Sequence, residues 1–172
     1  MTTPAQIGAA MALAVEMAQQ VKGATYPNPP VGAVILAADG EVAGVGATQA
    51  TGGAHAEVLA LRAAGDRAAG GTAVVTLEPC NHHGRTPPCV DALLDAGVGA
   101  VVYAVADPNP TAAGGAHRLH AAGVAVTAGM SGDEVAGGVL REWLHKQRTG
   151  LPHLTWKFAT SIDGRSAAAD GS

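Results

Sequence analysis

The chain has 172 residues, of which 48% are hydrophobic and 14% are charged, and its formal net charge is −4. This is enough apolar material for one well-buried domain, and it argues against extended disorder. The acidic balance and the 3% of aromatic residues argue against a basic face for a nucleic-acid backbone and against base-stacking platforms. We therefore expect no nucleic-acid partner.

The first predicted element is a helix over about residues 5–22, in which Ile7, Met11 and Ala18 fall on one apolar face. The stretch has no basic start, and Glu16 interrupts it, so it predicts neither a signal peptide nor a membrane span. We expect a cytoplasmic protein with no membrane partner. Its thiols should then stay reduced, which disfavours a disulfide.

The middle of the chain alternates between short apolar strands and helices. Asp39-Gly40 predicts a tight turn between two strands that form a hairpin. The predicted elements are strands over 31–38 and 41–48, a helix over 55–64, a strand over 72–77, a helix that starts at Pro87-Pro88 and ends at Gly97, a strand over 99–105, a helix near 114–122, a strand over 124–129 and a helix near 132–147. This order predicts a mixed or largely parallel sheet between two helical layers, a three-layer α/β/α domain.

A last segment begins at about residue 151. Its sequence "LPHLTWKFATSIDGRSAAADGS" starts as a further strand and ends in small polar residues. The segment is too short to be a domain of its own.

Residues 76–89, "TLEPCNHHGRTPPC", hold the only two cysteines of the chain. Cys80, His82, His83 and Cys89 could form a local site with two cysteine and two histidine ligands. Structural zinc sites, however, usually take their ligands in two separated pairs that join distant segments. The local site therefore stays as an alternative to a site with a remote ligand.

A remote ligand is available in "HAEVLAL", where His55 and Glu57 form a His-x-Glu pair. Zinc deaminases carry this pair, followed later by Pro-Cys and a second cysteine. In that interpretation His55, Cys80 and Cys89 bind zinc, which leaves the fourth position to water, as a catalytic zinc requires. Glu57 would not bind the metal; it would take a proton from the activated water and return protons to the ring nitrogen and the departing ammonia.

The positions of these residues on the predicted elements support the interpretation. His55 and Glu57 are two residues apart, which is about 200° around a helix, so they converge only at its first turn or cap. Cys80 follows a strand, and Cys89 falls in the first turn of a helix, where a thiolate is favoured.

Eight residues separate Cys80 from Cys89, whereas many zinc deaminases have two there. With this insert, the motifs "PNPPVGAVI", "HAEVLAL", "TLEPC", "GRTPPC", "DALLDAG" and "DPNP" resemble, in order and spacing, the deaminase domain of the bifunctional riboflavin-biosynthesis diaminohydroxyphosphoribosylaminopyrimidine deaminase/5-amino-6-(5-phosphoribosylamino)uracil reductase family. The likeness covers about residues 8–165. It implies a cytidine-deaminase-like α/β/α fold with a mixed sheet, a zinc cofactor, and hydrolytic loss of the 2-amino group of a phosphoribosylated pyrimidine, 2,5-diamino-6-(5-phosphoribosylamino)pyrimidin-4(3H)-one.

The resemblance also implies substrate contacts. Asn28 and His82 would face the pyrimidine or ribose, and Arg85, Asp107 and Asn109 would lie around the phosphoribosyl arm. A guanidinium at Arg85 suits phosphate oxygens. The family pattern Gly-x-Gly-x-His-x3-Gly-x2-His-Ala-Glu is broken at one point, because Thr48 stands where its first histidine would be.

For the domain organisation, the resemblance implies a zinc-dependent deaminase domain over 1–148. Residues 149–172 would be a linker and the truncated first strand of a dihydrofolate-reductase-like reductase domain, for which NADPH is the cofactor in the family. The chain itself is then expected to deaminate only. The sequence leaves the oligomeric state open, a homo-oligomer included.

Two other interpretations stay open. One is a zinc deaminase for another base or nucleoside, such as cytidine, guanine or tRNA adenosine; the long insert between the cysteines, the "DPNP" turn and the acidic charge argue against it. The other is a zinc-stabilised binding module without turnover.

Overall fold

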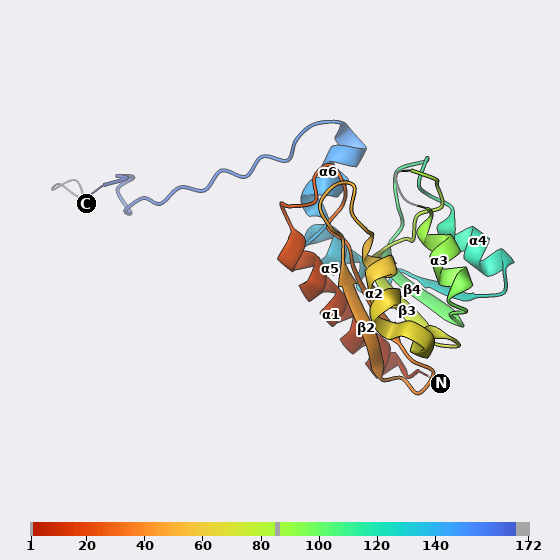
Figure 1. Ribbon diagram of the computed structural model, residues 1–172. Coiled ribbons are helices and arrows are strands. Elements are labelled where there is room, and N and C mark those ends of the chain that lie inside the picture. Colours follow the sequence, from red (N-terminus) through yellow and green to blue (C-terminus); the bar gives the residue numbers. More distant parts are fainter. Residues whose placement is uncertain (1, 85–86, 168–172) are drawn as a thin grey trace.

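The computed structural model describes residues 2–84 and 87–167, and these form a five-stranded mixed sheet in the order β2-β1-β3-β4-β5 (Figure 1). The strands are β1 Gly32–Leu36, β2 Val42–Ala47, β3 Thr72–Leu77, β4 Ala100–Val105 and β5 Ala125–Ala128. β1 runs antiparallel to both β2 and β3, whereas β3, β4 and β5 are parallel. The mixed sheet that the resemblance implies is therefore confirmed.

Helices cover both faces of this sheet. They are α1 Pro4–Val21, α2 Ala56–Ala64, α3 Cys89–Asp95, α4 Gly115–Ala121, α5 Gly132–Gly137 and α6 Arg141–Thr149, with a short 3-10 turn over Gly65–Ala68. In Figure 1, α2, α3 and α4 lie on one side of the sheet, and α1 and α5 lie on the other. This arrangement is the predicted three-layer α/β/α domain.

Local sequence signals explain where these elements begin and turn. α1 starts with a capping box, because the Thr3 hydroxyl accepts the Gln6 N–H while the Gln6 side chain accepts the Thr3 N–H. The hairpin between β1 and β2 turns at Gly40, whose φ of +87° is a conformation that glycine adopts without strain. Every residue of β1 and β3 is buried, and the apolar core lies on both faces of these strands.

Two glycines of β2 let α2 lie directly on the sheet. A Cβ atom at Gly44 would stand 2.2 Å from the Ala60 carbonyl oxygen, and one at Gly46 would stand 2.3 Å from the Ala56 carbonyl oxygen. Any larger residue would push the helix away from the strand. The absence of side chains at Gly44 and Gly46 therefore determines where α2 lies against β2.

One predicted element is wrong, and another forms no strand among the described residues. The helix predicted over 132–147 is two helices, because the chain turns at Gly138 with φ −106° and ψ −105°, which is not helical. The predicted strand from residue 151 does not form in the described part of that segment. Figure 1 shows this segment running away from the domain, where no neighbouring strand can pair its backbone groups.

Leu154, Trp156 and Phe158 in this segment are 88%, 82% and 68% exposed.

Within the described residues, none of the helices is both long enough and apolar enough to cross a bilayer.

Candidate active site

His55 and Glu57 converge at the start of α2, as predicted. His55 is the N-cap residue with extended backbone (φ −75°, ψ 159°), and Glu57 is the second helical residue. Because the chain enters the helix between them, their side chains are not held to the wide angle of a regular helix. The Glu57 side chain is buried, with 4% of the residue exposed.

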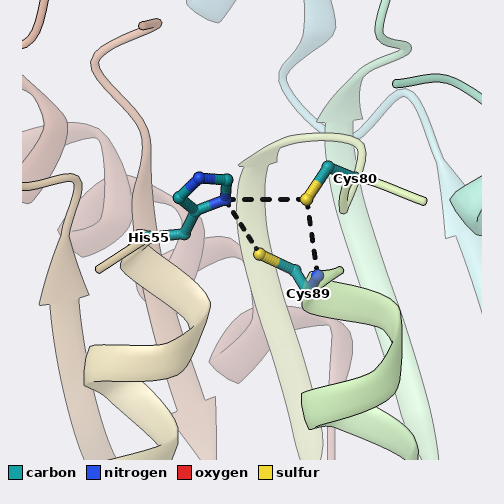
Figure 2. Close-up of side chains that lie close together, drawn as sticks. All are labelled: His55, Cys80 and Cys89. Atoms are coloured by element: carbon teal, nitrogen blue, oxygen red, sulfur yellow. Dashed lines mark hydrogen bonds between the residues drawn. The ribbon is translucent and has the colours of Figure 1, made fainter. Parts of the chain in front are cut away.

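Cys80 and Cys89 approach His55 from the next two elements. Cys80 lies in the loop after β3, and Cys89 is the first residue of α3; Figure 2 shows both sulfur atoms directed at the His55 ring. His55 Nδ1 lies 3.1 Å from Cys89 Sγ and 3.6 Å from Cys80 Sγ. The Cys89 N–H donates a hydrogen bond of 3.4 Å to Cys80 Sγ.

This donor set fits zinc. The three ligand atoms lie within 4.8 Å of one another. Tetrahedral zinc with ordinary Zn–N and Zn–S bond lengths separates nitrogen and sulfur ligands by about 3.6 Å, which matches the distance from His55 to Cys80; the 3.1 Å distance to Cys89 is shorter. Three protein ligands of this kind leave one position open, which is the pattern of catalytic rather than structural zinc.

The ionisation of these groups reflects their close contact. Hydrogen bonding from Cys89, and then from His55, lowers the pKa of Cys80 to about 4 despite its burial. The same bond to Cys80, followed by burial, raises the pKa of Cys89. Hydrogen bonding to Cys80 also raises the pKa of His55. Zinc would replace the shared protons of this trio.

Glu57 has the proton affinity of a general base near neutral pH. Burial is the largest cause, and the Cys80 charge the next, of a rise in the Glu57 pKa to about 7. A carboxyl group with a pKa close to the working pH both takes and returns protons readily.

The alternatives that keep the site within residues 76–89 are not favoured by the geometry. Among the described residues, the group of side chains that could hold a metal ion consists of His55, Cys80 and Cys89, without His82 or His83. The His83 side chain is 79% exposed and lies 3.9 Å from Asp91. Both cysteines are free, as expected for reduced thiols.

A pocket of about 360 Å³ opens beside the three candidate ligands. Its lining includes four of the five residues that the resemblance implies for substrate: Asn28, His82, Asp107 and Asn109. We call these four the pocket wall, and we call His55, Glu57, Cys80 and Cys89 the metal corner. Arg85, the fifth implied contact, lies outside the described residues.

Hydrogen bonds hold two members of the pocket wall, Asp107 and Asn109, in place. The Asp107 carboxylate accepts the Asn109 N–H at 2.8 Å, and the Asn109 side chain accepts the Thr111 N–H at 3.1 Å. Burial raises the pKa of Asp107, against the effect of the bond from Asn109. His82 Nδ1 is buried without a hydrogen-bond partner among the described residues, as expected for an atom that a ligand would satisfy.

Thr48, which replaces the family's histidine, also lines the pocket. Its hydroxyl accepts the Val31 N–H at 3.2 Å and is 3.4 Å from the Val31 carbonyl oxygen. Thr48 therefore joins the end of β2 to the residue before β1.

The structure adds lining residues that the sequence did not single out. They include Glu78, between β3 and Cys80, Thr51 from the loop before α2, and Trp143 and Gln147 from α6. The position of Glu78 inside "TLEPC" was a usable signal, because an acidic residue there directly follows a buried strand. Nothing local in the sequence places α6 against a pocket formed by residues more than thirty positions away.

The fold and this site define a zinc-dependent deaminase of the cytidine deaminase type. Residues 4–105 match the family described as the cytidine and deoxycytidylate deaminase zinc-binding region, and the chain belongs to this family.

Relatives place the chain more narrowly. It is 67% identical over 166 residues to the riboflavin biosynthesis protein RibD of Mycobacterium tuberculosis, covering 96% of this chain and 49% of that protein. RibD of Escherichia coli is 51% identical over 162 residues, covering 94% of this chain and 44% of that protein. The chain thus spans about half the length of these curated relatives.

Solved structures of RibD proteins have the same fold as this chain. Acinetobacter baumannii RibD superposes with a TM-score of 0.87 at 46% identity, over 96% of this chain and 46% of that one. A Thermotoga maritima diaminohydroxyphosphoribosylaminopyrimidine deaminase/5-amino-6-(5-phosphoribosylamino)uracil reductase superposes with a TM-score of 0.90 at 35% identity, over 97% and 48%. The chain therefore resembles RibD proteins in both sequence and fold.

Proposed function

We propose that the chain removes the 2-amino group of 2,5-diamino-6-(5-phosphoribosylamino)pyrimidin-4(3H)-one by hydrolysis, giving 5-amino-6-(5-phosphoribosylamino)uracil and ammonia. The observation that carries this proposal is that one pocket is lined by the pocket wall and by His55, Glu57 and Cys80 of the metal corner, whose fourth member, Cys89, lies beside His55 and Cys80. The likeness to RibD proteins of riboflavin biosynthesis supports the choice of substrate.

In this proposal His55, Cys80 and Cys89 hold zinc. When bound, zinc would act as the Lewis acid that activates water for attack on the carbon bearing the amino group. The Glu57 carboxylate takes a proton from the attacking water, and it delivers protons to the adjacent ring nitrogen and to the departing amine. Water supplies the new carbonyl oxygen, and ammonia is the leaving group, so the step is hydrolytic and needs no redox partner.

The pocket wall positions the substrate. His82 Nδ1, buried and without a partner among the described residues, is available to the pyrimidine or ribose, and Asn28 shares that role. Asp107 and Asn109 offer polar groups to the ribosyl arm, and Arg85 would pair with the phosphate. We further propose that the protein acts in the cytoplasm on this free small molecule rather than on a nucleic acid, as its net charge of −4 supports.

The test combines zinc analysis with ammonia release from the phosphoribosylated pyrimidine, using cytidine, guanine and tRNA as competing substrates. The wild-type chain should hold about one zinc ion and prefer the phosphoribosylated pyrimidine. Glu57→Gln should keep the zinc and lower kcat by about a thousandfold, the size of a lost general acid–base. Glu16→Gln, an exposed change on α1, is the matched control and should change neither value. Zinc binding without ammonia release from any substrate would show a binding module instead.

We also propose that residues 1–148 are the deaminase domain and that 149–172 are a linker and the first strand of a reductase domain. The exposed, alternating Leu154, Trp156 and Phe158 support this, since a strand without partners has this pattern. Removal of residues 151–172 should leave deamination unchanged, and the present chain should not oxidise NADPH in the presence of the deaminated product. NADPH oxidation by this chain would contradict the proposal.

A further inference from the structure

Glu78 is a buried acidic residue that the proposed chemistry does not use. It directly follows β3 and is 7% exposed. A buried carboxylate is costly unless hydrogen bonds satisfy its oxygens. Its bonding partners therefore indicate what it does.

Within residues 2–84 and 87–167, the three side-chain hydrogen bonds of Glu78 come from the main chain of one segment, residues 107–116. Glu78 Oε2 accepts the Asp107 N–H at 3.2 Å. Glu78 Oε1 accepts the Gly114 N–H at 3.2 Å and the Ala116 N–H at 3.0 Å. One carboxylate thus holds both ends of the segment that carries Asp107 and Asn109.

Within this segment, the side chains of Asp107 and Asn109 are bonded to the local main chain, so they move with it. The bonds from the Asn109 N–H to Asp107 and from the Thr111 N–H to Asn109 lock both side chains to the local main chain. A shift of the segment would therefore move both polar groups relative to the pocket.

The same segment also rests on the loop that carries Cys80. The Asn81 N–H donates to the Ala112 carbonyl oxygen at 2.9 Å. Gly115 lies so close to Pro79 that a Cβ atom there would stand 1.9 Å from the Pro79 carbonyl oxygen. The Glu78 carboxylate therefore sets the register between the end of β3, which leads to the metal corner, and the part of the pocket wall formed by Asp107 and Asn109.

We propose that Glu78 is a positioning residue that fixes residues 107–116 against the end of β3 and thereby sets the affinity for the ribosyl arm of the substrate. The part about affinity rests on the proposed function; the tie between Glu78 and the segment does not. Glu78 takes no proton in the reaction, because its role is to accept main-chain hydrogen bonds.

The near-isosteric change Glu78→Gln is the direct test. One of its two oxygens becomes an NH2 group, which faces an N–H donor and cannot accept from it. We expect KM for the phosphoribosylated pyrimidine to rise about tenfold, the effect of one lost hydrogen bond to a charged group, with kcat within about threefold of wild type. The zinc content should not change. In the protein without substrate, the amides of 107–116 should exchange with deuterium faster, while those of α1 should not.

Ala116→Pro tests the tie from the other side. It removes one donor to Glu78 at the second residue of α4, where a helix tolerates proline. The same rise in KM and the same faster exchange are expected. This variant therefore tests whether Glu78 holds residues 107–116 even if Glu78→Gln does not fold. Glu16→Gln is again the matched control.

Unchanged exchange in 107–116 for both variants would overturn the proposal. A loss of kcat as large as that of Glu57→Gln, with unchanged KM, would also overturn it, because Glu78 would then act in the chemistry. If wild-type protein releases no ammonia from the substrate, the proposed function fails, while the exchange measurement still decides whether Glu78 holds the segment.

Discussion

Two regions border the pocket and are held in different ways: the pocket wall, and the metal corner, of which His55, Glu57 and Cys80 line the pocket. The metal corner is attached to the starts of α2 and α3 and to the end of β3, and Glu57 and Cys89 are 4% and 0% exposed. The pocket wall lies in loops, and the loop that carries Asp107 and Asn109 is held by the side-chain acceptors Glu78 and Asp107. Close packing holds the metal corner, whereas individual hydrogen bonds hold Asp107 and Asn109 of the pocket wall.

This difference teaches where each kind of change should act. A change in packed elements displaces zinc ligands and lowers both stability and turnover. A change in the loops alters substrate affinity and leaves the metal in place. The predictions below test this division, from the largest expected effect to the smallest.

Loss of a ligand should have the largest effect. Cys89→Ser should reduce the zinc content to near zero and lower kcat by at least about a thousandfold, because water activation is lost with the metal. Metal analysis of the purified variant checks the first part, and ammonia release checks the second. His83→Ala is the control and should retain zinc. If His83→Ala lost zinc while His55→Ala kept it, the site would be the local one within residues 76–89.

A change behind the metal corner should act through packing. Gly46→Ala places a Cβ atom 2.3 Å from the Ala56 carbonyl oxygen, between His55 and Glu57 in sequence, so α2 must move. We expect a loss of about 1–3 kcal/mol in the free energy of unfolding and a weaker affinity for zinc. Urea unfolding and zinc titration measure these effects.

Gly8→Ala is the matched control, because a Cβ atom there meets nothing within 4 Å on an exposed face of α1. It should stabilise the protein by about 1 kcal/mol through helix propensity. Equal effects of the two alanines would show that the close approach of β2 and α2 does not matter.

A change in the substrate region should leave the metal in place. Arg85→Met should raise KM for the phosphoribosylated substrate by about tenfold or more, since a charge-assisted contact to phosphate would be lost, and zinc content should stay the same. The exposed Arg67→Met is the control. A similar KM for a substrate analogue without phosphate, in both wild type and variant, would confirm that Arg85 acts on the phosphate.

The smallest effect is expected at a surface ion pair. Lys22 Nζ lies 2.9 Å from Glu142 Oε2 and ties the end of α1 to α6. Partial burial alone would raise the Glu142 pKa, but hydrogen bonds from Lys22 and Arg141 outweigh it and lower the pKa from 4.5 to about 2. A lowered pKa in the folded state means that the contribution is present above pH 4.5 and is lost as the pH falls toward 2.

Because the pair is partly exposed, Glu142→Gln should cost only about 0.5 kcal/mol at pH 7. Urea unfolding at pH 7 and at pH 3 measures the difference from wild type, which should shrink at the lower pH. If the difference in the free energy of unfolding were larger at pH 3 than at pH 7, the Glu142 pKa would not be lowered in the folded protein.

Much of the metal corner could be predicted from sequence because its signals are local. The His-x-Glu pair falls at a helix start, and Pro-Cys follows a buried strand. Each of these patterns lies within a few consecutive residues. The sequence also predicted Asn28, His82, Asp107 and Asn109, through the resemblance of the motifs that contain them, and the structure places all four in the pocket.

By itself, the sequence determined the order of elements as far as β5, the three-layer class and the residue types of the metal corner, because propensity and short-range spacing decide these. Only the tertiary structure decided that α6 borders the pocket, that Glu78 holds residues 107–116 and that the helix after residue 132 is broken. These features depend on contacts between segments far apart in the chain. No local pattern records which distant main-chain groups a buried carboxylate will bind.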